Sequence, residues 1–401
     1  MKSELYNTII VSIDELWLKG KNRPYYFKVL KKNIKLLLKV SGRRDTSVHV
    51  ENHRFILNSD QPFSTENIDA ISKIPGTNSI IPALRINKNY DSIFPAVLKE
   101  IENSEMSKIR TFRIYTRRVD KHFPVKSMEV SREIGSLVIE EYPDLKAKMV
   151  NPDLQISIRI LKEYIYVSSK KIITPGGLPV GTNGHLVTML SGGIDSPVAS
   201  YLMSKRGCRQ TFMFFYAFPI VGEEVKGKIE KLISILGKYQ SGCRLYIIRS
   251  GEFQKKLMKL CKEEYRTVIF RKYMMETGTV LAEKIGAQAL LTGDSLGQVS
   301  SQTLINISEI DHFTRLSIFR PLVGLNKIEI IQLGKKIGTY EISIIPYDDA
   351  CSMLAPSHPV LRSDRTFLKK FFTENDLSGD ILTLVENADI YDIDPLGSIS
   401  K

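Results

Sequence analysis

The sequence predicts an α/β protein in which two small α+β units precede a larger domain built on a parallel β-sheet. After residue 185, short apolar runs alternate with longer helical patterns, as in β–α–β units. Before residue 174, shorter strand and helix patterns are mixed. Between the two lies TPGGLPVGTNG (174–184), whose four glycines and two prolines indicate a linker.

The first α+β unit is expected over residues 1–61. Residues 8–16 have the pattern of a strand, and 22–39 have that of a basic amphipathic helix. Residues 47–58 predict a hairpin with its turn near Asn52. The second unit is expected over 62–173, from a helix at 65–73, a strand at 79–86, a helix at 90–102, a strand at 111–118, a helix at 127–141 and a hairpin at 154–173.

The positive charge of the chain is concentrated in its first half. Of the net +13 over 401 residues, residues 1–180 contribute +10 (30 basic, 20 acidic) and the remainder +3 (27 basic, 24 acidic). This asymmetry fits a surface for nucleic acid or another polyanion, and it fits an evenly solvated basic surface equally well. The ordinary content of hydrophobic residues, 43%, excludes wholesale disorder.

The four cysteines are widely spaced, and this argues against a zinc site or a disulfide scaffold. They are Cys208, Cys243, Cys261 and Cys351. No uncharged run is long enough to span a bilayer, and acids interrupt the apolar N-terminus. We therefore expect a reduced, cytoplasmic protein without a membrane segment.

The strongest chemical signal is HLVTMLSGGIDSPVASYLMSKRG (185–207), in which SGGIDS (191–196) joins a strand to a helix. Two glycines allow the backbone to approach a ligand, and the hydroxyls of Ser191 and Ser196 with the helix N-terminus would bind pyrophosphate. Ser196 is expected as the N-cap and Pro197 at the first helical position. Asp195 would coordinate Mg²⁺ or orient a reacting group. The loop lacks the lysine of a Walker A motif and is not GxGxxG, whereas a plain Gly-rich turn is the simplest alternative.

SGGIDS resembles the pyrophosphatase loop (PP-loop) of enzymes that cleave ATP between its α- and β-phosphates and transfer AMP to a substrate oxygen. Several further segments are similar, in the same order, to the tRNA 4-thiouridine synthetase family, also called tRNA sulfurtransferase or thiamine biosynthesis protein ThiI. They are LWLKGKNRPYYFKVLKKNI (16–34), RVDKHFPVKSMEVSREIG (118–135), TGDSLGQVSSQT (292–303), RPLVGLNKIEI (320–330) and DDACSMLAPSHPV (348–360).

The resemblance implies a ferredoxin-like domain over 1–61, an RNA-binding THUMP domain over 62–173, a linker over 174–184 and a PP-loop domain over 185–401. The implied reaction uses ATP and Mg²⁺ to adenylate the 4-oxygen of the uridine at tRNA position eight. A persulfide sulfur then displaces AMP to give 4-thiouridine. The family also supplies sulfur for the thiamine thiazole ring.

Carried over residue by residue, the resemblance implies a set of ATP contacts at the ends of the predicted strands. They are Met189, Leu190, Ser191, Gly192, Gly193, Ser196, Phe214, Phe215, Arg271, Gly293 and Gln302. Apolar walls at the carboxyl ends of parallel strands suit adenine. Met189, Phe214 and Phe215 also suit the core of a sheet. Relatives often have His at the position of Phe214.

Three residues are candidates for catalysis: Asp195, Lys327 and Cys351. Asn326 and Glu329 resemble an N-cap with its N3 acid, so Lys327 would lie in the first turn of a helix, where a cation answers a nearby phosphate or is merely solvated. Cys351 matches the sulfur-carrying position of the family, and a structural loop cysteine is the alternative. Because relatives often carry a second cysteine in a rhodanese domain that is absent here, we expect persulfide to come from a separate protein.

The basic residues of the first half are candidates for contacts with the phosphates of a folded RNA. We expect such contacts from Lys19, Lys21, Arg23, Lys31, Arg117, Arg118 and Lys121. A solvated face of the basic helix is an equally simple explanation for its lysines.

The leading hypothesis is thus an AMP-forming tRNA sulfurtransferase, expected to be a homodimer because its family is. One alternative is a PP-loop ligase that acts on a small molecule. Another is a nucleotide-sensing RNA-binding protein without catalysis. Intact SGGIDS, Lys327 and Cys351 favour the enzyme.

Overall fold

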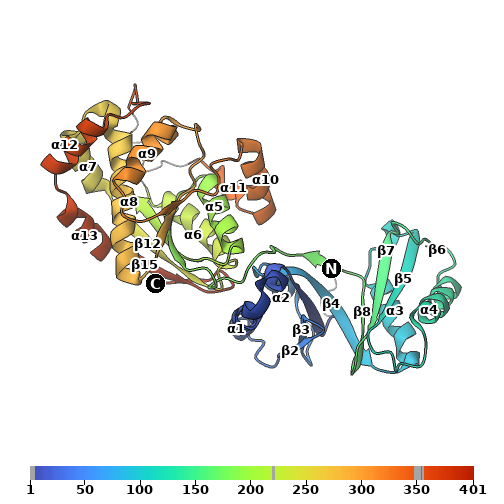
Figure 1. Cartoon of the computed structure of the whole chain (residues 1–401). Helices are drawn as coiled ribbons and strands as arrows, with labels where there is room; N and C mark the ends of the chain where they lie inside the picture. The colour runs from blue at the N-terminus through green and yellow to red at the C-terminus, as the bar shows by residue number, and fades with distance from the viewer. Residues whose placement is uncertain (1–4, 219–221, 347–353, 355) are drawn as a thin grey trace. The chain divides into compact units, whose positions relative to one another are not determined.

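The computed structural model describes residues 5–218, 222–346, 354 and 356–401 (Figure 1). Contacts within the chain define two compact units. The first combines the residues up to Asp14 with Ser41–Lys73 and Thr77–Gly176. The second combines Glu15–Val40, Ile74–Gly76 and Gly177–Lys401. Each unit has a mixed or mainly parallel β-sheet with helices, so the predicted α/β class is confirmed.

One continuous sheet runs through the first unit. Its described strands follow the order β2-β3-β1-β4-β8-β7-β5-β6, and β9 pairs with β4. The bounds are β1 (Thr8–Ile13), β2 (Ser47–Glu51), β3 (Arg54–Asn58), β4 (Thr77–Asn87), β5 (Thr111–Arg118), β6 (Lys146–Ala147), β7 (Leu154–Ile160), β8 (Tyr164–Ser168) and β9 (Ile172–Ile173). The long strand β4 pairs with β1 through residues 77–83 and with β8 through 84–87, so it belongs to both predicted α+β units.

Helices α3 (Ile93–Glu102) and α4 (Ser127–Glu141) cover one face of strands β5, β7 and β8 (Figure 1). Alternate residues of β5, such as Phe112 and Ile114, are buried against them. Helix α2 (Thr65–Ser72) begins at a capping box in which Ser64 and Asn67 bond each other's backbone. The remaining residues of β5, Arg113, Tyr115 and Arg117, point to the opposite face. This arginine-bearing face is not covered by α3 or α4.

The second unit opens with a 3₁₀ segment, η1 (Glu15–Asn22), and helix α1 (Arg23–Val40). The expected amphipathic pattern of α1 is confirmed, since its buried residues recur every three or four positions along one side. They are Leu30, Asn33, Ile34, Leu37 and Leu38. Its lysines at 28, 32, 35 and 39 are exposed. The basic face of α1 is therefore available to solvent.

A second sheet organises the rest of this unit. Its order is β14-β13-β10-β11-β12-β15-β16. Five strands are parallel: β10 (His185–Leu190), β11 (Arg209–Tyr216), β12 (Cys243–Arg249), β13 (Ala289–Leu291) and β14 (Ile318–Phe319). Strand β15 (Asp389–Ile393) pairs antiparallel with β12, and β16 (Ile399–Ser400) pairs antiparallel with β15. Strands β11 and β13 lie on opposite sides of β10, so the order in which strands are added to the sheet reverses at β10. A ligand site is expected at such a point, beyond the carboxyl ends of the strands.

Helices pack on both faces of this sheet (Figure 1). On one side lie α5 (Asp195–Lys205), α6 (Glu224–Gly237), α10 (Lys327–Ile337) and α11 (Tyr340–Ser343). The others are α7 (Gly251–Leu260), α8 (Arg266–Ile285), α9 (Leu304–His312), α12 (Arg365–Glu374) and α13 (Ser378–Glu386). Gly278 of α8 faces the sheet, where an added Cβ would lie 2.2 Å from Cε at the flexible end of Met189.

The segment 177–183, which follows directly from the first unit, is bonded to the end of α5. Leu178 N–H donates to Lys205 O (2.8 Å), and the N–H groups of Gly181, Thr182 and Asn183 all donate to Gly207 O. These bonds satisfy carbonyl groups that the end of a helix leaves free. The Gly- and Pro-rich stretch is therefore anchored to α5 from residue 178 onward.

Candidate active site

The phosphate loop lies between β10 and α5, as the sequence predicts, but its serines act differently from the expectation. Helix α5 begins at Asp195 after Ile194, and no side chain caps it. The prediction that Ser196 is the N-cap is therefore wrong. Ser196 is buried, and its Oγ instead accepts from Ser191 N–H (2.9 Å) and lies 3.1 Å from Ser191 Oγ. The loop is thus folded back on itself at the helix N-terminus, a position that favours anions.

The turn after β13 lies directly on this loop. An added Cβ on Gly293 would be 2.6 Å from Ser196 N and 2.8 Å from Ser196 Cα. These are backbone atoms of the helix start, so they cannot move aside as a flexible side chain would. Gly293 is required for the close approach of TGD (292–294) to the phosphate loop.

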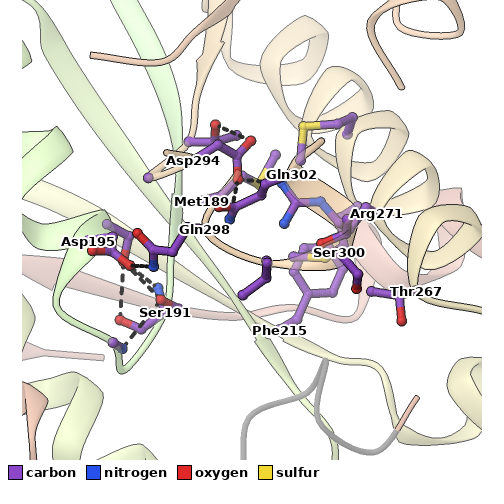
Figure 2. Close-up of a pocket in the computed structure, with 18 of the residues that line it drawn as sticks. Met189, Ser191, Asp195, Phe215, Thr267, Arg271, Asp294, Gln298, Ser300 and Gln302 are labelled. Atoms are coloured by element: carbon purple, nitrogen blue, oxygen red, sulfur yellow. Dashed lines mark hydrogen bonds and ion pairs between the residues drawn. The ribbon is translucent and has the colours of Figure 1, made fainter. Parts of the chain in front are cut away.

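Asp195 forms an ion pair with Lys327 across the start of the two helices. Lys327 Nζ lies 2.7 Å from Asp195 Oδ1. Gln298 Nε2 donates to Asp195 Oδ2 at 2.9 Å, and Figure 2 shows these two side chains side by side. The predicted position of Lys327 is confirmed, because Asn326 and Glu329 form a capping box at the start of α10. Two of the three catalytic candidates therefore lie in contact beside the phosphate loop.

Asp294 forms the centre of a buried polar network in the same cavity (Figure 2). Its carboxylate accepts from Thr292 Oγ1 (2.8 Å), Gln302 Nε2 (3.2 Å) and Arg320 Nε (3.1 Å), and it pairs with Arg271. Burial alone would raise the pKa of Asp294, but the attraction and hydrogen bonds of Arg271 and Arg320 hold that pKa below its ordinary value. The network thus keeps an ionised carboxylate between two guanidinium groups.

A cavity of about 530 Å³ joins these groups, a volume in the range of small-molecule sites. Among the predicted residues, its lining includes Met189, Leu190, Ser191, Gly193, Asp195, Ser196, Phe214, Phe215, Arg271, Gly293 and Gln302. Gly192 is buried within the loop, and Lys327 reaches the site through Asp195. The side chains of Met189, Phe214 and Phe215 are only 3–6% exposed, so they serve the sheet core and the cavity wall together.

Sequence reasoning missed several residues of the site. Gln298 and Asp294 were within a quoted motif but were given no role, and Thr267, Met274 and Pro359 also line the cavity. The sequence did indicate a role for Asp294, because an acid that follows a buried strand and a glycine lies at the carboxyl end of that strand, where ligands bind. Gln298 carried none, because its contact with Asp195 joins residues more than a hundred positions apart.

The cysteines divide into one outside the described residues and three inside. Cys351, the predicted sulfur carrier, lies outside them. Burial raises the pKa of the Cys261 thiol to about 11, and it also raises the pKa values of Cys208 and Cys243. A raised pKa disfavours the reactive thiolate. Among the described residues, no group of three or more His, Cys, Asp or Glu side chains could hold a metal ion.

The predicted RNA contacts occur in both compact units. Lys19, Lys21, Arg23 and Lys31 belong to η1 and α1, and Lys19 Nζ lies 5.2 Å from the centre of the Tyr26 ring. Arg117, Arg118 and Lys121 belong to the first unit. Arg118 Nη1 donates to the carbonyls of Phe123 and Val125, so it braces its own loop. Arg117 and Lys121 are exposed.

Arg117 is one of three clustered arginines in the first unit, with Arg54 of β3 and Arg159 of β7. Burial, followed by the charges of Arg54 and Arg117, lowers the pKa of Arg159 to about 10. Burial and the charge of Arg117 also lower the pKa of Arg54. Within the described chain, none of the three takes part in an ion pair. Mutual repulsion of this kind is relieved by a bound anion.

This architecture is similar to that of known protein families. Three family models match in chain order: the ThiI ferredoxin-like domain at residues 8–80, the THUMP domain at 87–170 and thiamine biosynthesis protein (ThiI) at 181–377. A "probable tRNA sulfurtransferase" of Alkaliphilus metalliredigens is 37% identical over 88% of this chain and 90% of its own length. Another, of Halothermothrix orenii, is 35% identical over 97% and 99%.

The chain belongs to the ThiI family of tRNA sulfurtransferases. A solved structure supports this: a crystal structure of a 4-thiouridine synthetase in complex with RNA and ATP has a TM-score of 0.85 and 29% identity, covering 97% of this chain and all of that one. The expected ThiI fold, with ferredoxin-like, THUMP and PP-loop domains in this order, is thereby confirmed. No described helix is both long and apolar enough to cross a bilayer.

Proposed function

We propose that this chain is an ATP-dependent tRNA uracil 4-sulfurtransferase that forms AMP. The observation that carries the proposal is the contact between Asp195 and Lys327 at the N-terminus of α5, beside a cavity of nucleotide size. The 4-oxygen of uridine eight would attack the α-phosphorus of ATP, and pyrophosphate would leave. Lys327 and the N-terminus of α5 would stabilise the charge that develops on the phosphates.

Within this reaction, each residue of the cavity has a role that its position supports. Met189, Phe214 and Phe215 would form apolar walls for adenine at the carboxyl ends of β10 and β11. Ser191, Gly192 and Gly193 would hold the pyrophosphate. Arg271, Gly293 and Gln302 would complete the ATP site from the opposite wall, where Asp294 orients the first and the last of them.

Mg²⁺ fits the donors present as an ion shared with the phosphates of ATP. Asp294 is occupied by two arginines, so Asp195 is the carboxylate that would contact the ion, and it is partly exposed. A single carboxylate together with substrate phosphates is the usual mode for Mg²⁺. The ion would neutralise phosphate charge, and Lys327 would then exchange Asp195 for a phosphate oxygen.

Sulfur would enter through Cys351. The terminal sulfur of its persulfide would attack C4 of the adenylated uridine, and AMP would leave. A second thiol would then cleave the sulfur–sulfur bond and leave 4-thiouridine. The raised pKa values of Cys208, Cys243 and Cys261 make these poor attacking thiols, so we assign this step to an external thiol. The persulfide would come from a separate donor protein, a cysteine desulfurase or a rhodanese.

For RNA, we propose two basic surfaces. One is the arginine-bearing face of the first unit, with Arg117 and Arg159. The other is the basic side of η1 and α1, where Lys21 is exposed and Lys19, Arg23 and Lys31 are partly exposed. Arg118 would act indirectly through its loop, and Lys121 directly. A homodimer, a cytoplasmic location and a role in thiamine sulfur transfer complete the proposal by analogy with the family.

The decisive experiment incubates the full chain with ATP, unmodified tRNA, cysteine and a cysteine desulfurase. AMP and the near-ultraviolet absorbance of 4-thiouridine should rise together. A matched tRNA with cytidine in place of uridine eight should yield neither. AMP formation that does not depend on tRNA would contradict the proposal and favour a ligase acting on a small molecule.

The proposed role of Cys351 in sulfur transfer is tested by a separate experiment. Cys351→Ser should form AMP with tRNA but no 4-thiouridine, and Cys243→Ser should behave as the unmodified chain. Normal thiolation by Cys351→Ser would show that sulfur takes another route.

A further inference from the structure

Asn306, near the start of α9, is a buried amide with every hydrogen-bonding position in use. It is 0% exposed. Its Nδ2 donates to Ser300 O (2.7 Å) and Val360 O (2.9 Å). Its Oδ1 accepts from Ser363 N–H (3.1 Å) and Ser363 Oγ (2.6 Å). One side chain therefore ties the segment before α9 to a segment about sixty residues later.

Thr303 supplies a second tie between the same two segments. It is the N-cap of α9 and accepts from Asn306 N–H at 3.2 Å. Its Oγ1 also donates to Leu361 O at 2.8 Å. We call Thr303, Asn306 and Ser363 together the wall clamp.

Both segments joined by the wall clamp form walls of the nucleotide cavity. Residues 298–302 line it on one side, and Pro356 and Pro359 line it on another. The clamp itself is outside the lining, so it touches no nucleotide. Its geometry fixes the separation of the two walls, because a buried amide whose four bonds are all made has one permitted orientation.

We propose that Asn306 is a positioning residue that holds these two cavity walls together and thereby couples ATP use to sulfur transfer. The inference rests on the proposed function. An adenylated uridine has two competing outcomes. Sulfur attack at C4 expels AMP and gives 4-thiouridine, whereas water attack expels AMP and returns uridine. In this proposal, walls held at a fixed separation restrict the access of water to the adenylate, so a loosened clamp increases hydrolysis and wastes ATP.

Two substitutions break the clamp in different places. Asn306→Asp keeps the shape of the side chain and the acceptor for Ser363, but it loses both donors and places an oxygen against two carbonyl oxygens. Thr303→Asp keeps the N-cap acceptor for Asn306 N–H and loses the donor to Leu361. Thr303→Ser keeps both functions and is the matched control. Since Thr303 is partly exposed, Thr303→Asp preserves the fold even where Asn306→Asp does not.

The readout is the ratio of AMP to 4-thiouridine formed by the full chain with ATP, tRNA, cysteine and a cysteine desulfurase. Loss of a clamp bond should raise this ratio about fivefold, the factor that corresponds to one net hydrogen bond. The rate of AMP formation should stay within about twofold, because Asp195, Lys327 and Arg271 are untouched. In water enriched in heavy oxygen, hydrolysed adenylate leaves the label in uridine or AMP, whereas sulfur transfer leaves none.

The possible results distinguish a positioning role of the wall clamp from a purely structural one. A raised ratio with heavy-oxygen label in Asn306→Asp and Thr303→Asp, and an unchanged ratio in Thr303→Ser, would support the inference. An unchanged ratio in Thr303→Asp with a normal melting temperature would overturn it, as would an equal rise in Thr303→Ser. Failure of the proposed function itself has a different mark, namely an unsubstituted chain that makes no tRNA-dependent AMP and no 4-thiouridine.

Discussion

Asp195 and Lys327 form an ion pair beside the phosphate loop. Their charges cancel at a distance of 2.7 Å, so neither carries an unpaired charge beside the phosphate loop. Lys327 is 45% exposed, so it can leave Asp195 without disturbing the core. In the proposed function, this exposure would allow Lys327 to contact the phosphates of ATP.

We expect Lys327→Met and Asp195→Asn each to slow tRNA-dependent AMP formation about a hundredfold or more, the usual effect of removing a group that stabilises phosphate charge. Lys336→Met, in the last turn of the same helix, should change the rate little. Pyrophosphate release measured at saturating ATP tests this. A rate for Lys327→Met equal to that of Lys336→Met would contradict the role of Lys327.

Glu100 provides a second test at the residue scale, in the first unit. Its Oε2 accepts from Ser169 N–H (3.1 Å) and Tyr6 OH (3.3 Å), whereas Oε1 has no hydrogen-bond partner among the described residues. Burial raises the pKa of Glu100 from 4.5 to about 7, outweighing these hydrogen bonds and the charge of Lys170. The folded chain therefore binds this proton more tightly than the unfolded chain does.

From this sign, Glu100 should reduce stability as the pH rises from about 4.5 to about 7, by up to about 3 kcal/mol. Glu100→Gln cannot ionise, so its free energy of unfolding relative to the unsubstituted chain should rise over that range and level off above it. Urea unfolding at several pH values measures this difference. A difference that is independent of pH would show that Glu100 titrates normally.

At the scale of elements, the contact between β13 and α5 is the most demanding in the site. A Cβ added to Gly293, in the turn after β13, would lie within 3 Å of backbone atoms of Asp195 and Ser196, and these atoms cannot move aside as a flexible side chain would. The phosphate loop thus depends on a neighbouring strand for its shape as well as on its own glycines.

We expect Gly293→Ala to push the two elements apart at a cost of about 1–3 kcal/mol and to weaken ATP binding by at least tenfold. Gly324→Ala is the matched control, because an added Cβ there meets nothing within 4 Å. Calorimetric titration with ATP, together with a melting curve for each variant, tests this. Equal ATP affinity in the two variants would mean that the contact has no bearing on the loop.

Local sequence patterns predicted those elements whose residues alone determine where they begin and end. Periodicity placed β5 and α4 at their observed bounds, and the Asn326–Glu329 pair placed the start of α10. Periodicity could not show that β4 pairs with strands of both predicted α+β units, nor that β15 pairs antiparallel with β12, because such pairing joins residues far apart in the sequence. Ser196 was misjudged for a different reason, since the helix begins one residue earlier, at Asp195, and the Ser196 hydroxyl bonds Ser191 in the loop before it.

The residues of the candidate site could be predicted where they belong to short sequence motifs. Asp195, Lys327 and Gln302 were named from such motifs, and the structure brings them to one cavity or into direct contact with it. Asn306 was not predictable, because an asparagine in the first turn of a helix is ordinary and only its bonds to residues 360 and 363 give it significance.

At the scale of the whole molecule, the excess positive charge does not coincide with one compact unit. Residues 1–180 carry +10 of the net +13, yet α1, with its exposed lysines, belongs by its contacts to the second unit. The arginine cluster of Arg54, Arg117 and Arg159 belongs to the first. An RNA that engages both surfaces would be held through phosphates at two separate places.

Binding through phosphates predicts a strong dependence on salt. Arg117→Gln and Arg159→Gln should each weaken RNA binding at low salt and reduce the slope of log affinity against log salt by about one. Arg132→Gln is the control, since Arg132 is exposed on α4, which covers the opposite face of the sheet. Filter binding of tRNA at several salt concentrations tests this. Unchanged slopes would place the RNA elsewhere.

The anchoring of residues 178–183 to the end of α5 also determines where the chain can be divided. By composition, any position in this glycine-rich stretch looks equally suitable for separating the RNA-binding and nucleotide-binding parts. A division after Asn183 would remove three N–H donors from Gly207 O and expose the last turn of the helix that begins at Asp195. A shortened catalytic part should therefore begin at or before Gly177.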